Sequence, residues 1–167
     1  MYDLKYEILV LGLGNTLMSD DGLAAHVVKG LKQKRWPSEI LILEIGTSAI
    51  FYLEEIGRSR RIIAVDAVRA GGPPGSVYRL TGDDVVLDGR RDSHGFSLLD
   101  VIGLAREMTG FPLDLTIYGV EPLDLSLGNH LSAPVKKALP EVINEIAKKM
   151  KILINNVDTG HRWDVHY

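Results

Sequence analysis

Two adjacent aspartates, Asp20 and Asp21, have the side-chain type and the setting for chemistry. They lie in a glycine-bearing loop, residues 12–22, between a continuous apolar run at 8–11 and an apolar pattern with helical spacing. The run is typical of a buried parallel strand, so the loop is expected at the carboxyl edge of a sheet. One acid at a helix start is often only a cap. We therefore assign Asp20 to capping and expect Asp21 to be available for chemistry.

Gly12-Leu13-Gly14 suggests a dinucleotide-binding fingerprint, but the third small residue of that motif is replaced by Leu17. Two carboxylates at the helix start would also repel a phosphate. Glu44, near the end of the second apolar run, can still mimic a ribose-binding acid, so an NAD- or flavin-dependent enzyme stays open as an alternative. The zincin helix, the Gly-x-Ser-x-Gly elbow and the Walker A pattern are absent from the sequence.

A second acid, Asp66, follows the third predicted strand at 61–65, and His94 precedes a predicted helix. If the strand order begins 2-1-3, ligands bind at the crevice where the connections diverge, between the first and third strands. Asp21 and Asp66 then meet there, and His94 comes from a loop at the same edge. Two carboxylates and one imidazole suit nickel, zinc, copper or iron, and leave coordination positions open. The ordinary alternatives are a turn cap for Asp66 and a surface position for His94.

The remaining histidines are given no role: His26, His130, His161 and His166.

Strands alternate with helices along the chain, which predicts one α/β domain over residues 1–154, a three-layer sandwich around a mostly parallel twisted sheet. Residues 155–167 are expected to form a loosely ordered tail.

Several local features are expected as well. Ser93 should cap the helix that closes at Gly110, and Ser132 the last helix, with Pro134 at its first position. Pro140 should kink or split that helix. Residues 76–80 should form a strand, 85–87 a short one and 113–117 a half-exposed edge strand.

Composition excludes several classes of protein. The 167 residues are 46% apolar and 25% charged, with a net charge of -3, so no footprint for nucleic acid or an anionic membrane is present. No apolar run approaches the ~20 residues of a membrane span, and no signal peptide is apparent. The absence of cysteine removes disulfides, thiolate metal sites and a cysteine nucleophile. We expect a cytoplasmic protein.

Six blocks over residues 8–150 together resemble the nickel-iron hydrogenase maturation endopeptidases. In chain order they are Gly12-x-Gly14-Asn15, Asp20-Asp21-Gly22, Val65-Asp66-Ala67, Pro74-Gly75-Ser76-Val77, Ser93-His94 and Gly119-Val120-Glu121-Pro122.

The resemblance implies an endopeptidase that removes a C-terminal extension from the hydrogenase large-subunit precursor after nickel insertion. It implies that Asp21, Asp66 and His94 coordinate the nickel, that the nickel belongs to the substrate, and that the protein has no tightly bound cofactor of its own. Asp21 is one methylene shorter than the Glu that the family also accepts, and Ala24 replaces a frequent glycine. We expect a monomer. A non-catalytic nickel chaperone with the same three ligands is the other alternative, and the attacking group stays open.

Overall fold

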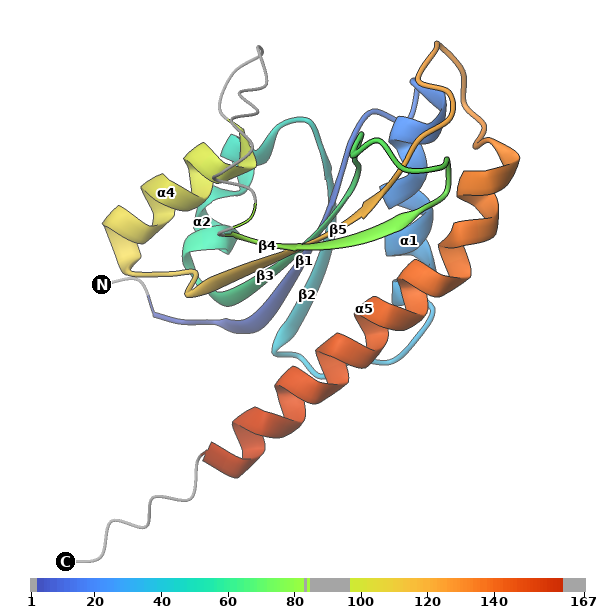
Figure 1. Ribbon diagram of the computed structural model, residues 1–167. Helices are drawn as coiled ribbons and strands as arrows, with labels where there is room; N and C mark the ends of the chain where they lie inside the picture. Colours follow the sequence, from blue (N-terminus) through green and yellow to red (C-terminus); the bar gives the residue numbers. More distant parts are fainter. Residues whose placement is uncertain (1–2, 83, 85–96, 161–167) are drawn as a thin grey trace, which may run out of the picture.

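A five-stranded sheet forms the middle layer of the protein (Figure 1). The computed structural model describes residues 3–82, 84 and 97–160, without the side chains of 158–160. The strand order is β2-β1-β3-β5-β4, which confirms the predicted beginning 2-1-3. The first four in this order are mutually parallel and β4 is antiparallel to β5. The bounds are Tyr6–Leu13 for β1, Ile40–Gly46 for β2, Ser59–Ala67 for β3, Val77–Thr81 for β4 and Asp114–Val120 for β5.

Helices cover both faces of the sheet, so the predicted three-layer α/β architecture is confirmed (Figure 1). Two helices, α1 (Leu23–Lys32) and α5 (Ala133–Gly160), pack on one face. The other face is covered by α2 (Leu53–Gly57) and α4 (Leu98–Thr109). Short 3-10 turns, η1 (Ser19–Gly22) and η2 (Ala49–Tyr52), precede α1 and α2. Among the helices that the structure describes, none combines the length and hydropathy that crossing a bilayer requires.

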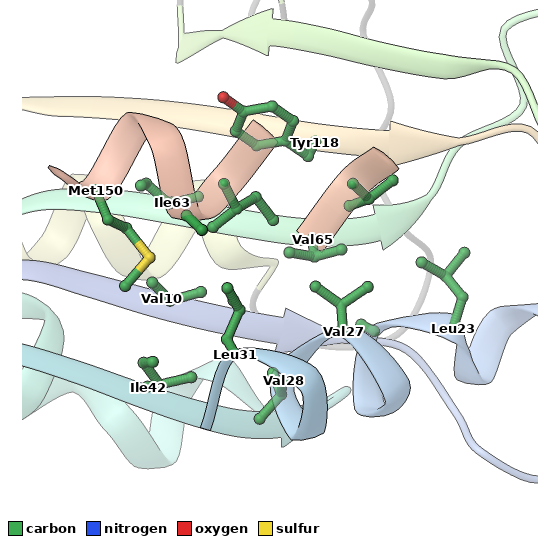
Figure 2. Packing of buried hydrophobic residues seen from close by; sticks show 14 of the residues in the cluster. Val10, Leu23, Val27, Val28, Leu31, Ile42, Ile63, Val65, Tyr118 and Met150 are labelled. Carbon is green, nitrogen blue, oxygen red and sulfur yellow. The ribbon is translucent and has the colours of Figure 1, made fainter. Parts of the chain in front are cut away.

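The continuous apolar run of β1 is explained by burial on both faces. Ile8 and Val10 belong to the cluster beneath α1 and α5, whereas Leu9 and Leu11 belong to the cluster beneath α2 and α4. Alternate side chains of a strand point to opposite faces, so a central strand needs apolar residues at every position. Figure 2 shows the first cluster, in which Leu31 of α1 and Met150 of α5 lie beside Val10.

The α4 helix begins later than expected. Its cap is Ser97, not Ser93, because the Ser97 hydroxyl accepts from the Asp100 amide while the Asp100 carboxylate accepts from the Ser97 amide. This reciprocal capping box satisfies two backbone N–H groups at once. Gly110 ends the helix in the left-handed conformation, with φ 80°, as predicted. Ser93, His94 and the expected strand at 85–87 lie outside the described residues, as do 161–167.

The expected edge strand is in fact interior. β5 lies between β3 and β4, and its residues from Leu115 to Val120 are buried. The chain turns back after β3, and β4 pairs antiparallel along the far side of β5. Alternation of Asp114 and Thr116 with apolar residues suggested solvent on one face, but Thr116 is buried.

The last helix is longer than expected and continues through Pro140. Pro140 does not split α5, which is one helix from Ala133 to Gly160, so Pro134 occupies its second position. Residues 155–160, expected in the loose tail, continue this helix. Leu153 and Ile154 pack against the core cluster, which anchors the turn from which the helix continues.

Burial along α5 gives a direct test of how it is held. Ile146 is fully buried and Ile152 is half exposed on the same helix. Ile146→Ala should lower the free energy of unfolding by about 3 kcal/mol, because it removes buried methylenes and leaves a cavity. Ile152→Ala is the matched control and should change it by less than about 1 kcal/mol. Urea denaturation measures both, and equal losses would show that α5 is not anchored at Ile146.

Candidate active site

Asp21 lies in η1, directly beyond the carboxyl end of β1. Its Oδ2 accepts a hydrogen bond of 2.7 Å from the Asn15 amide, and the Asn15 Oδ1 accepts one of 2.9 Å from the Leu17 amide. Gly14 has φ 104°, and a Cβ built there would overlap the Asp21 carbonyl oxygen. Only glycine allows both this backbone conformation and this close approach. The loop therefore folds back so that Asp21 lies against the end of β1.

Asp66 lies at the neighbouring strand end. It is the penultimate residue of β3, its Oδ1 accepts from the Ala67 amide at 2.8 Å, and it pairs in register with Gly119 of β5. Gly12 of β1 pairs with Val65, so Asp66 lies one residue further along, level with the start of the Gly14 turn. The parallel topology thus brings Asp21 and Asp66 to adjacent ends of β1 and β3.

The predicted third ligand, His94, lies outside the described residues. Among the residues that the structure describes, no group of three or more His, Cys, Asp or Glu is placed to hold a metal ion. Asp21 and Asp66 alone supply two carboxylates at this edge. A site with three ligands would need a further group. The role of His94 as that ligand remains a prediction.

Asp20 does not cap a helix, contrary to our expectation. Neither η1 nor α1 has a side-chain cap, and the Asp20 side chain is fully buried. Its carboxylate accepts from the amides of Leu123 and Asp124, each at 2.9 Å, and from the Ser132 amide and hydroxyl at 2.7 and 2.8 Å. The Ser132 hydroxyl is therefore turned to Asp20. Asp20 joins the loop after β1 to the segment 121–132 that follows β5.

Backbone contacts extend the same connection. The amides of Ser19 and Gly128 donate to the carbonyls of Gly128 and Leu17, both at 2.8 Å, and the Ser19 hydroxyl donates to the Ser126 carbonyl. Ser19 has φ 51°, an uncommon value for a residue with a side chain, and these bonds hold it there. In Figure 1 the two segments lie side by side, blue and orange, beyond the upper end of α1.

Burial raises the pKa of Asp20, but the hydrogen bonds from Asp124, Ser132 and Leu123 together outweigh it and hold the pKa below its ordinary value. The carboxylate form is thus the one that the fold stabilises. Four donors face two oxygens, so the charge is well compensated despite its burial.

Glu121 is a second buried acid whose role the sequence analysis missed. Its Oε2 accepts from the Ala70 amide at 2.8 Å and from the Tyr78 hydroxyl at 2.9 Å, and that hydroxyl accepts from the Gly72 amide. The Ala70 amide lowers the pKa of Glu121, with the Tyr78 hydroxyl adding to it against the effect of burial. Glu121 therefore fixes the loop that follows Asp66. The available signal was an acid directly after an apolar strand.

The arrangement does not suit a dinucleotide. α1 begins only at Leu23, six residues after the position where the fingerprint requires a small residue at the helix start, and that position is the exposed Leu17. Glu44 pairs in register with Gly12 on β2 and lies exposed. The amides that would face a pyrophosphate are therefore not where the motif places them.

A family model described as hydrogenase maturation protease, HycI, matches residues 25–149. The chain belongs to the hydrogenase maturation protease family. Among its relatives is the hydrogenase expression/formation protein HupD of Thiocapsa roseopersicina, 32% identical over 143 residues, 82% of this chain and 64% of that protein. This family member thus spans just under two thirds of HupD. The hydrogenase 2 maturation protease of Escherichia coli is 31% identical over 144 residues, 81% of this chain and 88% of that protein.

Solved structures of the family share the fold. The maturating endopeptidase HybD from E. coli superposes with a TM-score of 0.80 at 28% identity, covering 87% of this chain and 92% of HybD. The maturation protease HycI from Thermococcus kodakarensis gives a TM-score of 0.74 at 26% identity, with the same coverage. Our assignment to the family from sequence blocks is confirmed.

The Gly14 turn can be tested by adding one methyl group. Gly14→Ala should lower the free energy of unfolding by about 3 kcal/mol, because the Cβ strains the backbone and overlaps Asp21. Gly103, in α4, has open space around the position of a Cβ. Gly103→Ala should therefore raise stability by about 0.5–1 kcal/mol. Chemical denaturation of the two variants should give changes of opposite sign, and a tolerated Gly14→Ala would contradict the described turn.

The Asp20 contacts predict a pH dependence of stability. Asp20→Asn should lower the free energy of unfolding by about 3 kcal/mol at neutral pH, because it replaces a buried acceptor oxygen with an amide NH2 group that faces other donors. A lowered folded-state pKa means that the carboxylate's contribution is complete above the unfolded value of 3.8 and is lost as pH falls through the folded value. The difference in free energy of unfolding between wild type and Asp20→Asn should therefore become smaller below pH 3.8. Denaturation as a function of pH measures it.

The control for Asp20 is Asp114→Asn, since Asp114 is exposed and its nearest cation, Arg61, is 3.4 Å away. This variant should change stability by less than about 0.5 kcal/mol at neutral pH. If the difference in free energy of unfolding between wild type and Asp20→Asn did not change with pH, the ionised form of Asp20 would not be the stabilising one.

Proposed function

We propose that this protein is an endopeptidase that removes the C-terminal extension of a nickel-iron hydrogenase large-subunit precursor once nickel has been inserted. The observation that carries the proposal is the placement of Asp21 and Asp66 at adjacent strand ends in a member of the maturation protease family. HybD from E. coli, a structural relative, is a hydrogenase maturating endopeptidase. The substrate of the present chain is the precursor protein with its metal.

In this proposal Asp21, Asp66 and His94 bind the nickel that the precursor already carries. Imidazole and carboxylate both suit nickel, and three ligands leave positions for groups of the precursor. The Oδ2 of Asp21 is hydrogen-bonded to Asn15, but a carboxylate has about four lone-pair sites, so it can accept that bond and still coordinate. An ion shared between two proteins makes the nickel-loaded precursor bind more tightly than the empty one.

Nickel at this edge would serve catalysis as well as recognition. A divalent ion polarises a carbonyl or lowers the pKa of a bound water. The scissile bond must then lie close to the ends of β1 and β3. The loops on either side are held in place by Asp20 and Glu121. The carboxylates of Asp21 and Asp66 therefore extend from preorganised loops.

The proposal is tested by trimming of a purified precursor, loaded with nickel or free of it, followed by mass measurement of the large subunit. The loaded precursor should lose its C-terminal extension, and the empty one should not. Asp21→Ala, Asp66→Ala and His94→Ala should each reduce trimming at least ~100-fold, since even outer-shell changes at metal sites cost 10–100-fold. Each variant should keep a cooperative unfolding transition.

Asp114→Ala is the matched control, because Asp114 lies at the opposite end of β5 and is exposed. It should trim like the wild type. Normal trimming by Asp66→Ala would remove the proposed role of the site, and equal trimming of both precursors would remove the nickel dependence. A protein that binds nickel by itself and leaves the precursor intact would be a chaperone.

A further inference from the structure

Exposed leucines gather on the two segments that Asp20 joins. In the part of the chain that the structure describes, seven large apolar side chains are exposed: Leu17, Phe51, Met108, Leu113, Leu123, Leu127 and Ile152. Leu17 belongs to the loop after β1, and Leu123 and Leu127 to the segment after β5. These three residues are 62%, 59% and 82% exposed. We call these three the leucine rim.

The leucine rim is held by backbone hydrogen bonds. The Leu17 carbonyl accepts from the Gly128 amide, next to Leu127, and the Leu123 amide donates to buried Asp20. The Leu17 amide donates to the Asn15 side chain. The three side chains are therefore presented to solvent by ordered backbone, although apolar groups gain free energy by leaving water. Because the backbone is already ordered, little backbone entropy is lost when a partner covers these side chains.

The leucine rim is continuous with the proposed catalytic edge. Leu17 and Asp21 share one turn, in which the Asp21 carboxylate accepts from Asn15 and the Asp21 amide donates to the Met18 carbonyl. The Leu123 amide donates a hydrogen bond to Asp20, the residue before Asp21. A polypeptide whose bond reaches Asp21 and Asp66 therefore passes beside these leucines.

The apolar area of the leucine rim favours the precursor over a second copy of this chain as the partner. Three leucine side chains supply on the order of 300 Å² of apolar surface at most. A stable dimer buries roughly 800 Å² on each partner. A second copy of this chain would need much more surface than the rim provides. A substrate that is also held through its metal and its scissile segment needs only a small apolar contact.

We infer that the leucine rim is a docking surface for apolar side chains of the large-subunit precursor beside its cleavage point, and that Leu17, Leu123 and Leu127 determine substrate affinity. This inference rests on the proposed function. Each leucine covered by the precursor contributes roughly a tenfold gain in affinity when fully buried. Contacts that form before the bond is broken and persist in the transition state change KM and leave kcat unaltered.

The experiment uses the full-length chain and the nickel-loaded precursor. Leu17→Ser/Leu127→Ser should raise KM for trimming at least tenfold with kcat within twofold of wild type, and should weaken precursor binding by a similar factor in calorimetric titration. Leu113→Ser is the matched control, because Leu113 is 56% exposed and lies at the opposite edge of the sheet, just before β5. It should leave KM and binding unchanged. Thermal unfolding verifies that both proteins are folded.

The outcomes separate this inference from the proposed function. If the wild type trims the precursor and the double variant matches Leu113→Ser in KM and affinity, the leucine rim is not a docking surface, while the protease assignment stands. If the wild type binds the precursor through the leucines without trimming it, the docking surface stands and the endopeptidase proposal fails. If sedimentation shows a wild-type dimer that the double variant abolishes, the partner is a second copy and the inference is overturned.

Discussion

The buried carboxylate of Asp20 is the interaction on which the carboxyl edge of this protein depends. It receives four hydrogen bonds from a segment more than 100 residues later in the chain, and so joins the loop after β1 to the segment after β5. Removing a charged group from water is costly, and only a full set of donors makes it favourable. Satisfying this carboxylate therefore requires both segments to adopt one arrangement, the one that places Asp21 beside Gly14.

A second buried acid repeats this role on the other side of the edge. Glu121 accepts from Ala70 and Tyr78 and thereby positions the loop that follows Asp66. The two carboxylates proposed to bind the nickel, Asp21 and Asp66, thus each lie next to a loop held by a different buried carboxylate. The candidate site depends less on the helices than on these long-range hydrogen bonds, which connect the ends of β1, β3 and β5.

The sheet and the placement of Asp21 and Asp66 could be predicted from sequence because they follow from local pattern and topology. Apolar runs identified β1 to β3, and the rule for parallel sheets brought the two acids to adjacent strand ends. The role of Asp20 could not be predicted. An acid before a helix has the same local setting whether it caps that helix or reaches Leu123. β5 was misplaced for a similar reason, since its alternating pattern does not reveal that β4 returns to pair with it.

The chemistry of the Asp20 contacts has an implication for how this surface can diversify. Two of its donors are main-chain amides of Leu123 and Asp124, and a main-chain amide is supplied by any residue other than proline. The position of this segment is therefore largely independent of the side chain at 123. Related chains can exchange that side chain for a larger, smaller or polar one without rebuilding the backbone beneath it, so the surface presented at position 123 and the stability of the fold can change separately.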